Sequence, residues 1–204
     1  MTTDGIKEPL LLTIAVLGGT GKEGKGLAYR WAKAGYKVLI GSRSEERAVT
    51  AASEIMELAE GSTSIVGTTN KEAAQLADIV VLTVPLVPPK VTTVQMPSAG
   101  SAAQEAKEIV GEGVEVVAAF HSISHEHLLK DDYVESEVLV TGTSKDARAE
   151  VIKLVEAAGL TGWDAGPIEN SVVLEGLTSV LIYINKQYGS THAGIKITGA
   201  SNKQ

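Results

Sequence analysis

At 204 residues the chain is long enough for one full domain, or for one domain with a small helical appendage. Its residues are 44% hydrophobic but only 4% aromatic, so we expect an aliphatic core, as in a parallel sheet covered by helices. The formal net charge of −7, without a basic block, argues against nucleic acid and anionic membranes as main partners. The lack of Cys excludes disulfides, thiolate catalysis and Cys-based metal sites.

The first residues show no targeting signal. Residues 1–10 lack the charged and then apolar pattern of a signal peptide, and no apolar run approaches the length that spans a membrane. We therefore expect a soluble, cytoplasmic protein.

A strand, a glycine cluster and a helix follow one another early in the chain. Residues 11–17 are apolar and β-branched, which predicts a buried strand, and residues 27–34 predict a helix. Between them, Gly19, Gly21 and Gly24 match G-x-G-x-x-G, whose glycines permit a tight turn, backbone approach to a pyrophosphate and close packing of helix on strand. This context predicts a dinucleotide site, and a glycine turn without a ligand is the alternative.

The end of the second predicted strand indicates which dinucleotide is bound. Residues 37–41 form that strand, and its end is where a protein that binds NAD usually places Asp or Glu against the ribose hydroxyls. Here Ser42 and Arg43 follow, with Arg47 one helical turn further on. Guanidinium groups bind phosphate bidentately, so the pattern favours NADP(H) and its 2′-phosphate. Alternatively, the two arginines are solvated charges that offset neighbouring glutamates.

Strand and helix signals continue to alternate along the chain. In order, we predict a helix capped by Ser44 and ending at Ala59, a strand over 64–67, a short helix over 71–76 capped by Asn70, a strand over 78–85, an irregular connection over 86–100, a helix over 101–110, strands over 113–120 and 137–142, a helix capped by Ser144 and ending at Gly159, an edge strand over 160–164 and a helix over 168–188.

This order predicts an α/β fold: a Rossmann-like, doubly wound, mainly parallel sheet with a small C-terminal helical part. We expect an NADP-binding domain over residues 1–166 and a helical segment over 167–204 that packs on it.

The histidines are the main candidates for chemistry outside the glycine motif. His121 ends a predicted strand, where side chains face the ligand crevice, so it is a candidate substrate contact or else a satisfied or solvated histidine. His125 and His127 lie close by, but no recognisable ligand pattern joins them, so we expect no metal site. No G-x-S-x-G elbow is present, and hydride transfer between two cofactors needs few catalytic side chains.

At this point the sequence resembles the F420-dependent NADP reductases, which pass hydride between NADP(H) and the deazaflavin coenzyme F420. The resemblance extends in family order over nearly the whole chain, through residues 17–28 (LGGTG, two further residues, GKGLA), 40–43 (IGSR), 78–85 (DIVVLTVP), 86–88 (LVP), 119–123 (AFHSI), 164–167 (DAGP), 175–178 (EGLT) and 194–196 (GIK).

The resemblance implies a site for each cofactor, a homodimer and no metal. Gly19, Thr20, Gly21, Lys22 and Glu23 would line the NADP pyrophosphate, and Ser42, Arg43 and Arg47 would hold the 2′-phosphate. Val84 and Pro85 would border the nicotinamide, while the loop of Phe120 and His121 and the region of Ala193 would lie near the deazaflavin.

The chain departs from the family pattern after Pro85. In the family a helix and a strand intervene before the Leu-Val-Pro segment, whereas here Pro85 joins Leu86 directly. The missing length is about 25–30 residues, the size of one parallel crossover. We expect the sheet to lose one strand, which leaves an apolar face of the sheet exposed. A neighbouring chain or residues 86–100 would have to cover this face. NADP phosphate binding, built mostly by residues 14–47, is expected to survive.

Two other functions fit the sequence less well. One is an NADPH-dependent reductase of a small imine or carbonyl substrate, which would normally have a larger helical domain and a Lys, Asp or Tyr donor. The other is a non-catalytic NADP-binding module, which the deletion makes plausible.

Overall fold

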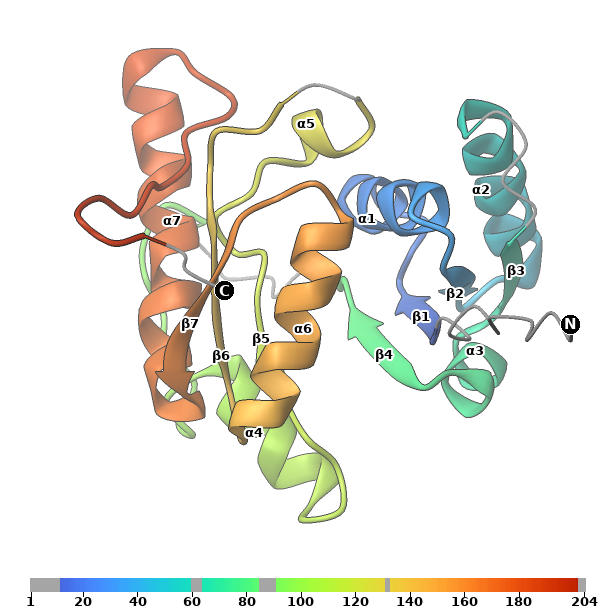
Figure 1. Ribbon diagram of the computed structural model, residues 1–204, viewed down its shortest axis with the longest axis horizontal. Helices are drawn as coiled ribbons and strands as arrows, with labels where there is room; N and C mark the ends of the chain where they lie inside the picture. Colours follow the sequence, from blue (N-terminus) through green and yellow to red (C-terminus); the bar gives the residue numbers. More distant parts are fainter. Residues whose placement is uncertain (1–11, 60–63, 85–90, 131–132, 202–204) are drawn as a thin grey trace, which may run out of the picture. The chain divides into compact units, whose positions relative to one another are not determined.

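The computed structural model describes residues 12–59, 64–84, 91–130 and 133–201, arranged in two compact units (Figure 1). The first unit is Met1–Val84 and the second is Pro85–Gln204. The domain boundary expected between residues 166 and 167 lies inside the second unit. That residues 167–204 form a separate part stays a prediction.

The first unit contains a parallel sheet of four strands. Its members are β1 (Thr13–Leu17), β2 (Lys37–Ser42), β3 (Ile65–Thr69) and β4 (Ile79–Leu82), in the order β3-β2-β1-β4. Val16 lies opposite Ile40 on one side and Val81 on the other. This arrangement confirms the predicted Rossmann-like parallel sheet, because parallel neighbours require a helical crossover between consecutive strands.

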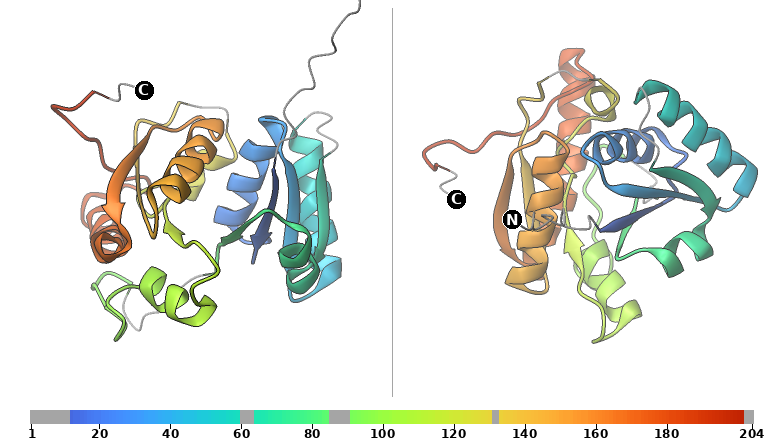
Figure 2. Two further views of the ribbon diagram at one scale, coloured as in Figure 1. Left: turned by 60° about the horizontal axis from the view of Figure 1, so that its bottom comes forward. Right: turned by 45° about the vertical axis from the view of Figure 1, so that its right-hand side comes forward.

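Helices cover both faces of this sheet, as Figure 2 shows. The helices α1 (Lys22–Lys33) and α2 (Glu45–Leu58) pack on one face, and α3 (Asn70–Leu76) packs on the other. On the α3 face, Ala15 and Leu39 are buried against Ala73. Small side chains at this contact let α3 lie close to the sheet.

The caps of these helices show how far local signals decide the boundaries. Ser44 caps α2 as predicted, and its Oγ accepts from the Arg47 N–H. The predicted cap Asn70 is wrong, because Thr69 Oγ1 accepts from the Glu72 N–H at 3.2 Å and Asn70 becomes the first residue of α3. The first helix begins earlier than predicted, directly after Gly21.

The second unit has a sheet of three strands in the order β5-β6-β7. β6 (Val138–Gly142) and β7 (Gly162–Pro167) are parallel, whereas β5 (Val117–Ala118) runs antiparallel to β6. The strand predicted over 113–120 is therefore wrong in length. Glu115 interrupts its apolar run and residues 113–115 are exposed, so burial does not extend a strand through them.

The described helices of the second unit are α4 (Ala102–Val110), α5 (His125–Leu128), α6 (Lys145–Ala157), a 3₁₀ turn η1 (Ile168–Asn170) and α7 (Ser171–Tyr188). The helices α4, α6 and α7 lie where the sequence predicted them, whereas the short helix α5 was not predicted. Ser144 caps α6 as predicted, with its Oγ accepting from the Ala147 N–H at 3.2 Å. None of the helices within the described ranges is long and apolar enough to cross a membrane.

The strand β4 forms one edge of the first sheet and carries exposed apolar side chains. Val80 and Leu82 are 45% and 64% exposed, and they share the α3 face with Ala15 and Leu17. A doubly wound sheet normally continues at this point with a further helix and strand. The described part of the connection, at Thr93 and Val94, instead packs on α7, where Ser179 Oγ donates to the Thr93 carbonyl.

Candidate functional site

The glycine motif folds into a turn that joins β1 to α1. The Gly19 N–H donates to the carbonyls of Val16 (3.2 Å) and Gly41 (3.1 Å), and the Gly21 N–H donates to the Gly18 carbonyl (3.2 Å). Gly18 has a backbone φ of +74°, which residues other than glycine rarely adopt. The turn is therefore fixed by its own backbone and by the end of β2.

Two of the predicted glycines are required by close approach of the backbone. A Cβ on Gly19 would lie 2.7 Å from the Val16 carbonyl oxygen, and a Cβ on Gly24 would lie 2.7 Å from the Gly19 Cα. The same Cβ on Gly24 would lie 2.8 Å from Thr83 Oγ1. The helix α1 can thus pack directly on the turn and on the end of β4, as the motif requires.

Gly21 is the N-cap of α1, so the first helical N–H groups point out of the turn. Thr20 is half-buried and Lys22 is exposed beside this helix start, where a phosphate would meet N–H groups and a positive dipole. Glu23 lies in the first turn, and burial raises its pKa to about 7. Glu23 is therefore partly protonated near neutral pH, which reduces its repulsion of an anion.

The end of β2 presents the residues expected at the 2′-phosphate. Ser42 is buried and its Oγ accepts from the Ser44 N–H at 3.2 Å, while its hydroxyl hydrogen can still be donated. Arg43 and Arg47 are exposed at the start of α2. No carboxylate occupies the ribose position itself, which Gly41 and Ser42 fill. These residues can bind a phosphate without repelling it.

Residues of the glycine turn, α1 and α2 line a surface hollow of about 320 Å³. Its walls are Thr20, Lys25, Glu46, Arg47, Thr50, Ala51 and Glu54. Lys25 forms an ion pair with Glu54, so part of the positive charge is already neutralised. Thr20 and Arg47, predicted for pyrophosphate and 2′-phosphate, line the same hollow.

The nicotinamide end of the predicted site is only partly described. A Cβ on Gly18 would lie 2.9 Å from Val84 Cγ1, so Val84 does lie beside the glycine turn. Pro85, the second residue predicted there, is outside the described residues. The sequence did not indicate that Thr83 takes part in this site. Its Oγ1 donates to the Leu17 carbonyl at 3.0 Å, at the end of β1. Its place at a strand end was the available signal.

In the second unit, the loop after β5 holds His121 in an apolar pocket. Phe120 has a φ of +67°, an uncommon conformation for a non-glycine residue that often marks functional loops. His121 lines a crevice with Leu139 and Leu174 that is too narrow to hold a water molecule, and no hydrogen-bond partner for its Nδ1 occurs among the described residues. Burial lowers the pKa of His121, and the carboxylate of Glu175 partly opposes this effect. The imidazole is therefore neutral at physiological pH.

The structure brings the His121 loop and the region of Ala193 together. Ser136 Oγ donates to the Ser122 carbonyl (3.1 Å) and accepts from the Ile195 N–H (3.1 Å). The Ala193 N–H donates to Asn185 Oδ1 at 2.8 Å, which ties the segment to α7. Two segments far apart in sequence, both expected near the deazaflavin, thus meet at one side chain.

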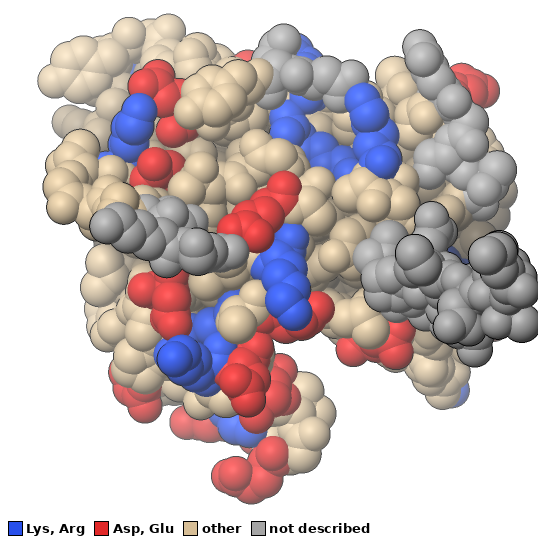
Figure 3. Space-filling model, in the orientation of Figure 1, with Lys and Arg blue, Asp and Glu red and all other residues tan. Residues whose placement is uncertain are grey.

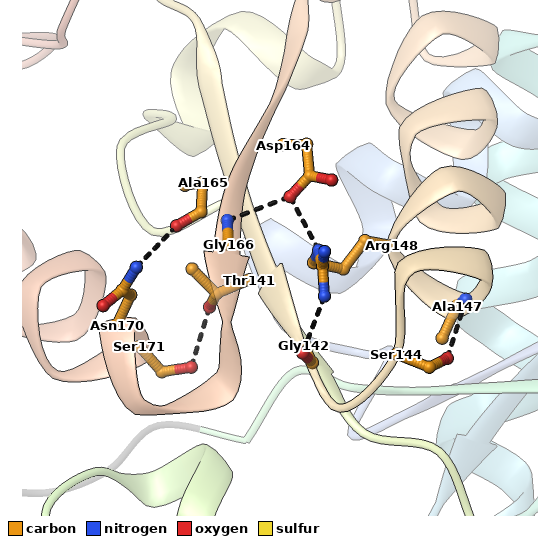
Figure 4. A network of polar contacts seen from close by, with 10 residues as sticks. All are labelled: Thr141, Gly142, Ser144, Ala147, Arg148, Asp164, Ala165, Gly166, Asn170 and Ser171. Atoms are coloured by element: carbon orange, nitrogen blue, oxygen red, sulfur yellow. Dashed lines mark hydrogen bonds and ion pairs between the residues drawn. The ribbon is translucent and has the colours of Figure 1, made fainter.

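The Asp-Ala-Gly-Pro motif at the end of β7 has a structural role, as Figure 4 shows. Asp164 Oδ1 accepts from Arg148 Nε at 2.6 Å and from the Gly166 N–H at 2.9 Å, and an Arg148 guanidinium nitrogen donates to the Gly142 carbonyl. These bonds join α6 to β6 and β7. The Arg148 guanidinium lowers the pKa of Asp164.

Clustered metal-ligating side chains and clustered positive charge are the remaining candidates for a site. No group of three or more metal-ligating side chains occurs among the described residues, His125 and His127 included. On the face displayed in Figure 3, one group of described Lys and Arg side chains gathers in the upper part without Asp or Glu among them, while the other groups lie beside Asp and Glu.

Comparison with known proteins identifies close sequence relatives. The family model "NADP oxidoreductase coenzyme F420-dependent" matches residues 13–110. An F420-dependent NADP reductase of Methanothermobacter thermautotrophicus is 36% identical over 228 aligned positions, which cover 96% of this chain and 98% of the relative. An F420-dependent NADP reductase of Methanocaldococcus jannaschii is 33% identical, and the alignment covers 92% of this chain and 98% of that relative. The 228 aligned positions exceed the length of this chain, so the relative has residues without a counterpart here.

Solved structures agree with the fold. A crystal structure of a protein from Arthrobacter sp. FB24 has a TM-score of 0.73 at 20% identity and covers 92% of this chain and 99% of its own. A reductive aminase from Aspergillus terreus, solved with NADPH and ethyl levulinate, has a TM-score of 0.56 at 13% identity and covers 88% of this chain but 62% of its own. At these identities the likeness concerns the fold alone.

Proposed function

This chain belongs to the F420-dependent NADP reductases, and we propose that its glycine turn and the end of β2 hold NADP(H) for hydride exchange with coenzyme F420. The observation that carries this proposal is the pairing of a closely packed glycine turn with Ser42 and Arg43, where a carboxylate would select NAD. We assign Gly19, Thr20, Gly21, Lys22 and Glu23 to the pyrophosphate, and Ser42, Arg43 and Arg47 to the 2′-phosphate.

The chemistry of the reaction is supplied by the two cofactors. NADPH gives a hydride to oxidised F420, a proton from water completes reduced F420, and NADP⁺ leaves. The side chains of this chain bind and orient the two rings. We assign Val84 and Pro85 to the nicotinamide side. Phe120, His121 and Ala193 are our candidates for the deazaflavin, where a neutral His121 can contact the ring system without bringing a charge.

We further propose that the chain is a homodimer that acts on these small molecules in the cytoplasm. Exposed apolar residues on α7 support self-association, since Val173, Val180 and Tyr183 are 64%, 44% and 55% exposed and recur at helical spacing. The molar mass of the purified chain by light scattering tests the dimer. A mass of one chain at micromolar concentration would contradict it.

A spectrophotometric assay tests the proposed activity. We expect loss of oxidised-deazaflavin absorbance when F420 and NADPH are mixed with the protein, and little loss with NADH. Parallel reactions supply a cyclic imine or a ketone in place of F420. Turnover of those substrates alone would favour the imine or carbonyl reductase. NADPH binding without turnover of any acceptor would instead identify a non-catalytic binding module.

A further inference from the structure

Asn70 occupies an unexpected place at the glycine turn. It is the first residue of α3, and because Thr69 Oγ1 already caps that helix, the Asn70 side chain is not needed as a cap. Its Oδ1 instead accepts a hydrogen bond from the Gly18 N–H at 3.3 Å, across 52 positions of sequence. The β3–α3 junction is thereby joined to the first residue of the turn.

The space that Asn70 fills is left by Gly41. A Cβ on Gly41 would lie 2.8 Å from Asn70 Oδ1 and 3.2 Å from Asn70 Cα, closer than ordinary van der Waals contact. The absence of a side chain at the end of β2 thus serves a second purpose besides the cofactor. It lets α3 bring a carbonyl oxygen to the end of β1.

The Gly18 N–H differs from the other amides of the turn in its acceptor. The N–H groups of Gly19 and Gly21 are held by backbone carbonyls, whereas that of Gly18 is held by a side chain. Gly18 also carries the left-handed φ of +74° that begins the turn. The orientation of its peptide group therefore depends on Asn70 more than on the local backbone.

We propose that Asn70 is a positioning residue for the cofactor site, acting through Gly18. It fixes the start of the glycine turn and thereby the amides that meet the pyrophosphate. Because NADPH and NADH share the pyrophosphate, loss of Asn70 weakens both cofactors by the same factor and leaves the preference between them unchanged. This inference rests on the proposed NADP site but not on F420 turnover.

Amide hydrogen exchange and cofactor binding on the full chain test the proposal together. In Asn70→Ala we expect the Gly18 amide to exchange at least about tenfold faster while that of Gly19 stays protected. The Kd of NADPH and of NADH rises by the same factor, about three- to tenfold, as for one neutral hydrogen bond. Asn70→Asp keeps the acceptor oxygen, so it retains Gly18 protection. Gln75→Ala, exposed on the same helix, is the control and changes neither.

Several results would overturn the proposal. They are unchanged Gly18 exchange in Asn70→Ala, loss of Gly18 protection in Asn70→Asp, NADPH affinity in Asn70→Ala within twofold of the wild type, or a loss confined to NADPH. If Asn70→Ala does not fold, Gly18 exchange in Asn70→Asp decides the question. If the wild type binds no NADPH, the proposed function fails, while the exchange data still test the contact between Asn70 and Gly18.

Discussion

We propose that single side chains at the end of β2 decide which dinucleotide the site binds. Arg43 is exposed and carries a guanidinium suited to phosphate, and the neighbouring ribose position has no acid. Exposure in the free protein means that the Arg43 side chain need not break a strong internal bond to reach a phosphate. We therefore propose that the preference for NADP(H) depends mainly on this residue.

Replacing Arg43 by Ala is expected to remove most of this preference. We expect the Kd of NADPH to rise about 10- to 100-fold, as for loss of one charge-assisted hydrogen bond, and that of NADH by less than about threefold. Isothermal titration measures both values. Lys186→Ala removes one exposed positive charge on α7 and is the control. An unchanged ratio of the two Kd values would show that the 2′-phosphate is held elsewhere.

Glu23 gives the site a predicted pH dependence. Its folded pKa is about 7, above the ordinary 4.5, so the folded state binds the proton more tightly than the unfolded state. The stability from this proton is complete below pH 4.5 and is lost as pH rises toward 7. Above pH 7 the half-buried carboxylate is mostly charged, and we expect it to repel the pyrophosphate.

We therefore expect Glu23→Gln to bind NADPH more tightly than the wild type at pH 8. At pH 6, where Glu23 is mostly protonated, the difference in affinity between the two proteins is expected to be smaller. Glu23→Gln is also expected to gain unfolding free energy relative to the wild type over the same range. Comparing the two proteins cancels the ionisation of the 2′-phosphate. Urea unfolding and NADPH titration at both pH values measure the effect. Parallel pH profiles for the two proteins would show that Glu23 does not titrate near neutrality.

Elements joined by local signals were easier to predict than those joined across the fold. Ser44 and Ser144 cap helices through N–H groups three residues later, a pattern visible in sequence. The start of α4 also has a local cap, because Ser101 Oγ accepts from the Gln104 N–H at 3.1 Å. Glu175 adds a distant contact, since its carboxylate accepts from the Ala102 N–H at 2.7 Å and the Ala103 N–H at 3.0 Å. Since that partner lies more than 70 residues away, no local pattern could reveal it.

The same distinction explains which site residues could be found. Gly19 and Gly24 were predicted from motif spacing, because steric demands of a strand–turn–helix unit act within a few residues. Asn70 was predicted as a local cap, and its contact with Gly18 became visible only when the order of strands was known.

The contact between α6 and β7 makes a prediction about stability. Asp164 has a lowered pKa because Arg148 and the Gly166 N–H bond its charged form, so its contribution is present above pH 3.8 and is lost as pH falls through the folded pKa. Because the Asp164 side chain is 39% exposed, solvent screening limits the cost of Asp164→Asn to about 1 kcal/mol at pH 7.

Chemical unfolding at several pH values measures this difference. It is expected to shrink steadily below pH 3.8, and Lys153→Ala, which removes an exposed helical ion pair with Glu150, changes unfolding less. A difference between Asp164→Asn and the wild type that stays constant down to the acid limit would show that the carboxylate charge is not what stabilises this contact.

The whole chain combines an intact phosphate site with a shortened sheet. The sequence alone indicated a missing crossover after Pro85, and the alignment with the Methanothermobacter thermautotrophicus reductase is longer than this chain. In the structure β4 is an edge strand whose Leu82 is 64% exposed. The residues that we propose for NADP phosphate binding lie from the end of β1 to the start of α2, well before residue 85.

The central claim is direct hydride transfer from NADPH to F420 by this shortened chain. The most direct test uses NADPH carrying deuterium at both nicotinamide C4 positions, with oxidised F420 and purified protein in ordinary water. Mass spectrometry of the reduced F420 is expected to show one deuterium per molecule. Reduced F420 without deuterium, or no reduction by a chain that binds NADPH, would contradict the account.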